Sequence, residues 1–266
     1  RYFLNCRIVL FPARTQGDQR QMYREMEPAT EYQGADLEAL ANLHRYQRWV
    51  IEIFLPYLSG RVIEFGAGVG NISTLIRPHV ATLDLVEPSA NLVISLKRRF
   101  GDTDCVAIYE ESLESRLLET ADETYESIVL VNVLEHIEDD AMALEGFYRI
   151  LKPGGHLLLF VPALEFLFSD LDVVLRHFRR YQRPELNRRT TGAGFDIVKS
   201  RYFDVLGVFP WWLLNTKMGA TEFNPVLASI YDAVFVPLSR GLESLAPPPF
   251  GKNIILVARR PEGPKK

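Results

Sequence analysis

Hydrophobic residues follow two patterns along this chain, a helical spacing and short continuous runs. Between Asp36 and Leu55 they recur every three to four positions, as one face of an amphipathic helix requires. Short apolar runs then alternate with further helical patterns. The runs predict strands at 61–65, 82–87, 105–109, 126–132 and 156–162, and the helical patterns lie at 71–79, 89–100 and 139–151. Strands that alternate with helices at this spacing predict a doubly wound α/β sheet.

The second half of the chain has a different texture. Residues 184–191 are expected to form the first part of a helix, and two late strands are expected at 195–202 and 253–259. About fifty residues rich in Trp, Phe, Leu and Pro separate these strands, which is too long for a bare loop and predicts an ordered helical insertion.

The predicted fold is therefore a Rossmann-like, doubly wound sheet of seven mostly parallel strands. An N-terminal helical arm precedes it, and a helical cap is inserted between the last two strands. We expect four parts: the arm and cap helix at 1–60, the core at 61–201, the apolar insertion at 202–253, and the final strand and tail at 254–266.

Composition narrows the class of partner. The 266 residues carry a net charge of −4, so no global positive field favours nucleic acid, and a small-molecule substrate is expected. Cys6 and Cys105 are the chain's two cysteines, which argues against a disulfide framework or a zinc site and fits a reducing cytoplasm. The apolar stretches at 202–214 and 225–238 are shorter than the ~20 residues of a spanning helix, so no transmembrane segment is expected.

A glycine turn, Glu64-Phe65-Gly66-Ala67-Gly68-Val69-Gly70, joins the first predicted strand to a helix. Glycine has no Cβ, so a ligand can approach the backbone closely there. A nicotinamide dinucleotide fingerprint needs a glycine where Asn71 stands, which disfavours an NAD-dependent oxidoreductase. A second acid, Glu87, ends the next strand before Pro88 and could accept hydrogen bonds from both hydroxyls of a ribose.

Residues 61–162 resemble the class I S-adenosylmethionine-dependent methyltransferases. The resemblance rests on the glycine turn and on three later segments: Glu111-Ser112-Leu113, Asn132-Val133-Leu134-Glu135-His136-Ile137 and Leu151-Lys152-Pro153-Gly154-Gly155. It implies S-adenosylmethionine (SAM) as cofactor, S-adenosylhomocysteine as product, adenine contacts at 111–113 and Asn132 beside the transferable methyl. The cofactor-binding residues that it implies are Glu64, Gly66, Ala67, Gly68, Gly70, Asn71, Glu87, Pro88, Glu111, Ser112, Leu113 and Asn132.

Further segments resemble a subgroup of mostly uncharacterised bacterial methyltransferases, of a type 11/12-like kind. These segments are 41–49 (ANLHRYQRW), 176–181 (RHFRRY), 201–203 (RYF) and 248–251 (PPFG). They support the fold and the cofactor but imply no substrate, because function depends on the site and not on the fold.

Two histidines are candidate general bases. His177 could take a proton from an acceptor hydroxyl, or it could be a salt-bridge anchor. The flanking Arg176, Arg179 and Arg180 would depress its pKa or bind an anionic substrate. His136, beside Glu135, is either a base or structural.

No metal is expected at this place. In some methyltransferases that act on quinone precursors, an acid-x-x-Glu-His cluster here is associated with a divalent metal. Asn132 replaces the first acid in this chain, so the resemblance does not extend to that cluster.

The insertion bears on the acceptor. Its aromatic residues are Phe209, Trp211, Trp212, Phe223, Tyr231 and Phe235. One interpretation is a helical cap with its own core. The other is an exposed functional surface: a lid over an apolar acceptor, a homodimer contact or a membrane-surface contact. We therefore expect O-methylation of an apolar or aromatic natural product or lipid-like compound. The alternative from another class is a SAM-binding partner subunit without catalysis.

Overall fold

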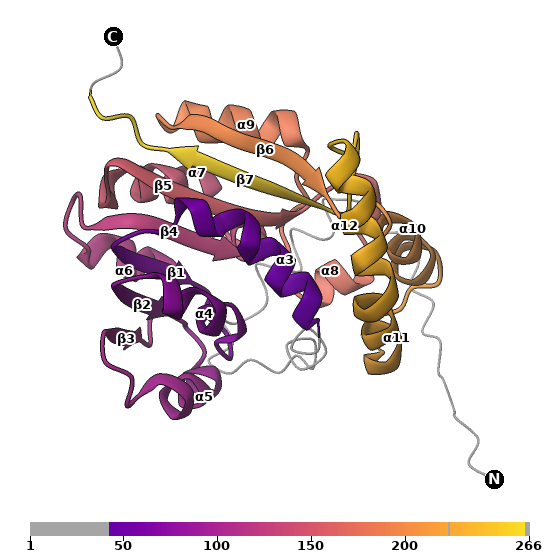
Figure 1. Cartoon of the computed structure of the whole chain (residues 1–266), viewed down its shortest axis with the longest axis horizontal. Helices are drawn as coiled ribbons and strands as arrows, with labels where there is room; N and C mark the ends of the chain where they lie inside the picture. The colour runs from indigo at the N-terminus through magenta and orange to yellow at the C-terminus, as the bar shows by residue number, and fades with distance from the viewer. Residues whose placement is uncertain (1–42, 223, 264–266) are drawn as a thin grey trace.

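The computed structural model describes residues 43–222 and 224–263, and its seven strands form one sheet (Figure 1). The predictions for the arm before Leu43, for Cys6 and for Phe223 lie outside the described residues. The strand order is β3-β2-β1-β4-β5-β7-β6. The strands are β1 Arg61–Phe65, β2 Thr82–Val86, β3 Val106–Tyr109, β4 Tyr125–Val131, β5 Leu151–Pro162, β6 Asp196–Phe203 and β7 Asn253–Arg259.

Strands β1 to β5 pair in parallel, whereas β7 is antiparallel to both β5 and β6. The predicted seven-stranded, mostly parallel sheet is confirmed. The core helices are α3 His44–Phe54, α4 Asn71–Ile76, α5 Ala90–Phe100, α6 Leu113–Glu119, α7 Asp140–Ile150, α8 Asp170–Val174 and α9 Arg183–Gly192. Short 3-10 turns lie at Leu55–Tyr57, Arg77–His79, Leu134–His136 and Glu165–Leu167.

Both faces of the sheet are buried. Side chains alternate across the pleat, so neighbouring residues of β1 enter different cores. Val62 packs in one core with α3, α4 and α5, and Ile63 packs in the other with α6, α7 and α9. This explains why β4 ends in the continuous apolar run Ile128-Val129-Leu130-Val131.

The predicted helical insertion between β6 and β7 is confirmed. It contains α10 Val208–Trp211, the π-helical turn η5 Trp212–Lys217, α11 Pro225–Ile230, the π-helical turn η6 Tyr231–Phe235 and α12 Val236–Leu245. Figure 1 shows α11 and α12 end to end at the edge of the molecule far from β3. Among the described helices, none combines the length and the apolar character needed to cross a bilayer.

The local differences from the sequence prediction concern elements with weak hydrophobic periodicity. Residues 152–155 were expected to form the turn before the fifth strand, but β5 already begins at Leu151. Tyr125 pairs with Leu151 and Ser127 pairs with His156, so the four residues 152–155 loop out of an otherwise continuous ladder. Helices α6 and α8 were not predicted, because each is short and has no long apolar repeat.

Candidate active site

A cavity of about 550 Å³ opens at the carboxyl ends of β1, β2, β4 and β5. The strand order reverses between β1 and β4, which is the place where open α/β sheets bind ligands. Its volume is within the usual range for a small-molecule site. All the predicted cofactor-binding residues line it except Gly70 and Glu111, and both candidate bases line it as well.

The glycine turn fits tightly against its neighbours. Gly66 and Gly68 have φ of +68° and +57°, and a Cβ on Gly66 would lie 2.4 Å from Val133 Cγ2. The N–H groups of Gly66 and Ala67 both donate to Val86 O, at 2.8 and 3.1 Å. Glycine is therefore required at Gly66 by backbone conformation and by space.

Gly70 has a different position from the one expected. It lies outside the cavity lining, has a φ of +83° and is the N-cap residue that precedes helix α4. A Cβ there would meet Phe100 Cε2 at 2.6 Å. Its geometry therefore indicates a role in packing α4 against α5.

Glu87 is held rigidly at the end of β2. Its Oε2 accepts from the Gly68 N–H and its Oε1 accepts from the Ser89 N–H, both at 2.9 Å. Each carboxylate oxygen keeps a second acceptor position. Two fixed acceptor atoms facing the cavity suit a pair of ribose hydroxyls.

Glu64 is buried beside the turn, and its Oε2 has no hydrogen-bond partner among the described residues. Burial raises the pKa of Glu64 to about 8. A buried acid that lines a cavity and has an oxygen without a partner among the described residues is suited to a cationic ligand. SAM carries a sulfonium and an ammonium group, so the lining fits this cofactor.

The segment expected near the adenine divides in two. Ser112 and Leu113 line the cavity, and the Ser112 hydroxyl also caps α6 by accepting from the Ser115 N–H at 3.2 Å. Glu111 points away and pairs with Arg116 at 2.9 Å. Asn132 lines the cavity with a φ of +53°, a conformation that Asn tolerates, and its N–H donates to Phe160 O at 2.8 Å.

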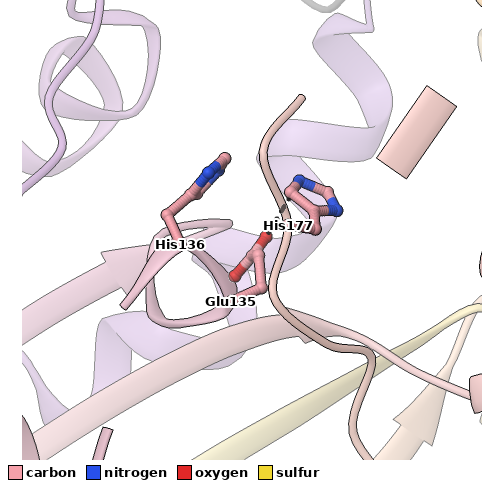
Figure 2. Close-up of side chains that lie close together, drawn as sticks. All are labelled: Glu135, His136 and His177. Carbon is pink, nitrogen blue, oxygen red and sulfur yellow. Dashed lines mark ion pairs between the residues drawn. The ribbon is translucent and has the colours of Figure 1, made fainter. Parts of the chain in front are cut away.

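His177 is a buried residue held by a carboxylate. Its Nδ1 lies 2.9 Å from Asp172 Oδ1, and its Nε2 lies 3.9 Å from Glu135 Oε1. Figure 2 shows the Glu135 carboxylate pointing toward this ring, and the His136 ring centre lies 4.7 Å from that of His177. A carboxylate on Nδ1 fixes the orientation of an imidazole and favours the tautomer that carries the proton on Nδ1.

His136 and Glu135 have perturbed acidities. Desolvation lowers the pKa of His136 to about 3, and the charge of His177 acts in the same direction. Burial raises the pKa of Glu135 to about 7, against the opposing influence of His177. A base with a pKa near 3 is poorly matched to neutral pH, so the low pKa of His136 makes His177 the better candidate for proton acceptor.

Glu135, His136 and His177 each offer a ligand atom, and these atoms all lie within 4.8 Å of one another. Such a spacing suits a divalent cation as well as proton transfer. The expectation that the site needs no metal stays a prediction.

Two of the three arginines that flank His177, Arg179 and Arg180, are paired with carboxylates of the protein. Arg179 pairs with Asp140 at 2.8 Å, and Arg180 forms two hydrogen bonds to Asp172 at 2.9 and 3.1 Å. Carboxylates therefore compensate both charges inside the protein, and neither arginine is available as a bare anion grip. The sequence did not reveal these pairs, because Asp140 lies on α7 and Asp172 on α8, and only the tertiary fold brings them to the arginines.

Several lining residues were not predicted as site residues. Trp211 and Lys252 come from the insertion, and Tyr46 comes from α3. The Lys252 ammonium pairs with Asp204 at 3.2 Å and lies 4.9 Å from the Tyr46 ring centre and 5.6 Å from that of Trp211. Asp172 was also missed; its spacing from Ser169 marks a helix start, but no local signal reveals its contact with His177.

Comparisons with known proteins identify the family. A family model described as a methyltransferase domain matches residues 20–200. The ubiquinone/menaquinone biosynthesis C-methyltransferase UbiE of Desulfotalea psychrophila is 25% identical over 149 residues, which cover 54% of this chain and 58% of that protein. This chain matches between 5% and 65% of the length of its first curated relatives.

Two solved structures share the fold. A chain of the complex between the Haloferax volcanii Trm112 methyltransferase activator and a methyltransferase superposes with a TM-score of 0.59 at 17% identity, covering 87% of this chain and 97% of that one. The [4+2]-cyclase SpnF superposes with a TM-score of 0.54 at 18% identity, covering 83% and 82%. The family match decides against a nicotinamide oxidoreductase. The chain belongs to the methyltransferase-domain family, with the class I fold, and S-adenosylmethionine is its cofactor.

Proposed function

We propose that this protein transfers the methyl group of SAM to a hydroxyl of a small apolar or aromatic acceptor. The observation that carries the proposal is a single cavity that joins the glycine turn to His177. A cofactor held by Glu64, Gly68 and Glu87 shares this space with a buried, oriented imidazole. Its walls between these groups include apolar side chains, namely Val50, Leu92, Phe160, Leu175 and Trp211.

The chemistry needs little from the protein beyond position. SAM supplies a methyl group already activated on a sulfonium, and holding two reactants in line and away from water can supply most of the rate. His177 is the residue that we propose as general base, because Asp172 orients its ring and the residue lines the same cavity as the glycine turn. It would take the hydroxyl proton as the new O–C bond forms and the bond between sulfur and the methyl group breaks, which leaves S-adenosylhomocysteine.

The insertion at 202–253 is proposed to cover the acceptor. Trp211 and Lys252 line the cavity from this segment, and Trp211 Nε1 donates to Leu167 O at 3.1 Å. The Arg180 guanidinium lies over the same indole at 4.5 Å. An indole held in place by a hydrogen bond and a cation–π contact suits packing against a flat or apolar acceptor.

The test combines calorimetry with a labelled-SAM screen of phenolic, lipid-like and polyketide-like acceptors. We expect SAM to bind in about the micromolar range. His177→Ala should lower turnover by about 10²- to 10⁴-fold, the usual contribution of a general base, with less than a threefold change in SAM affinity. His136→Ala, the matched control, should lower turnover less.

Failure of SAM or S-adenosylhomocysteine to bind would contradict the central proposal. Binding with no turnover of any acceptor would favour the role of a SAM-binding partner subunit. Unchanged turnover in His177→Ala would remove this residue from the proposed mechanism.

A further inference from the structure

The long helical unit α11–η6–α12 presents an apolar surface to solvent. We call this surface the apolar face; it comprises Val226, Leu227, Ile230, Val234, Phe235, Leu238, Leu242 and Leu245. Exposure runs from 39% at Phe235 to 85% at Leu245. The spacing of three to four residues places most of these side chains in one stripe. Soluble proteins rarely expose so many large apolar side chains together without a partner.

The opposite side of the same helices is fixed against the protein. The carboxylate of Asp232 accepts the Arg45 and Tyr46 N–H groups at 3.0 and 2.9 Å, which anchors η6 on the start of α3. Glu243 accepts the Val205 N–H at 3.0 Å. Both acids of Pro225–Leu245 are thereby turned inward, with exposures of 7% and 5%. The apolar face therefore carries no exposed carboxylate.

Cationic side chains border this face. A hollow of about 500 Å³ lies between α3 and α12, and we call it the basic hollow; it is lined by His44, Arg45, Arg48, Val236, Pro237 and Arg240. Arg240 pairs with Glu52 at 2.7 Å. Within the described part of the chain, the side chains of Arg45 and Arg48 form no ion pair. Among the described residues, Arg45 and Arg48 therefore give the hollow positive charge that no carboxylate pairs with, and Pro237 of the hollow adjoins Leu238 of the apolar face.

We propose that the apolar face and the basic hollow together dock on a membrane surface that contains anionic lipid. An apolar stripe with basic residues at its border is the arrangement by which helices lie in the interface of a bilayer. The acyl boundary would receive Leu238 and Leu242, and the lipid phosphates would lie at Arg45 and Arg48. This surface is separate from the cavity and does not depend on the proposed acceptor.

Charge favours a membrane over a second copy of the chain. In a two-fold dimer through the apolar face, the same patch meets itself, so two basic hollows would border one interface. Like charges in that arrangement repel, whereas an anionic bilayer attracts both parts of the surface.

Vesicle flotation of the full chain tests the proposal. Vesicles of phosphatidylcholine with phosphatidylglycerol should bind the protein at least roughly tenfold better than phosphatidylcholine alone, and added salt should weaken the binding. The double variants Leu238→Glu/Leu242→Glu and Arg45→Glu/Arg48→Glu should each lower the bound fraction at least roughly tenfold. Leu118→Glu is the matched control, because Leu118 is 86% exposed on the distant helix α6.

Thermal unfolding and SAM calorimetry on every variant establish that the fold and the cofactor site are intact. No binding of the wild-type chain to anionic vesicles would overturn the proposal, as would binding that either double variant retains. Light scattering adds a further decisive outcome: a wild-type dimer that Leu238→Glu/Leu242→Glu dissociates would assign the apolar face to a second copy instead. Because no methyl transfer is measured, these outcomes are independent of the proposed reaction.

Discussion

Glu64 is the residue whose charge should respond most directly to the cofactor. Its carboxyl is buried, and burial raises the pKa to about 8, with the neighbouring Glu87 acting in the same direction. At pH 7 the group is thus mostly protonated in the free protein. A cation placed beside it favours the carboxylate, so SAM binding should expel the proton.

We predict that SAM binding at pH 7 releases nearly one proton and that affinity rises as the pH increases from 7 toward 8. Calorimetry in two buffers with different ionisation enthalpies measures the release. Glu64→Gln should abolish it. Glu111→Gln should retain it, because Glu111 pairs with Arg116 outside the cavity. Equal proton release in the wild type and Glu64→Gln would show that another group titrates.

At the scale of elements, the glycine turn separates into a binding part and a packing part. Gly66 lines the cavity, whereas Gly70 immediately precedes α4, and a Cβ added there would meet Phe100 and Leu96 of α5. Gly70→Ala should lower the free energy of unfolding by about 2 kcal/mol, since it adds a clash and a strained φ. Urea titration of the cofactor-free protein measures this loss.

Cofactor affinity distinguishes the two glycines. SAM calorimetry at low temperature should show a smaller loss for Gly70→Ala than for Gly66→Ala, whose added methyl would collide with Val133 beside the cavity. The reverse order of affinities would place Gly70 in the binding surface and contradict the division.

The order of elements was predictable from local patterns, and the contacts of the site were not. The apolar runs gave β1 and β7 with their observed bounds, because buried strands need continuous hydrophobic residues. Family motifs indicated Glu87 and Asn132. Asp172 and Glu135 were not recognisable as partners of His177, since they come from segments that only the tertiary fold brings together. The pairing of Arg180 was missed for the same reason.

At the scale of the whole molecule, one buried acid connects the insertion to the sheet. Asp204 follows β6 and is fully buried. It accepts the Gly207 N–H at 3.1 Å and the Ser239 hydroxyl at 3.4 Å, and it pairs with Lys252 at 3.2 Å. The Tyr231 hydroxyl also donates to it. The carboxylate thus joins α10, η6, α12 and the start of β7, so the insertion should unfold together with the core.

We predict that Asp204→Asn lowers the free energy of unfolding by about 3 kcal/mol, because it leaves the mostly buried Lys252 ammonium without its counter-charge. Scanning calorimetry should show one transition at a lower temperature. Asp196→Asn is the matched control; Asp196 is exposed on β6, and its substitution should change stability by less than about 0.5 kcal/mol. A separate early transition for the insertion, with the main transition unmoved, would contradict a shared folding unit. In that case the insertion, with Trp211 and Lys252, would move independently of the cavity that these residues line. The proposed acceptor cap would then be a mobile lid.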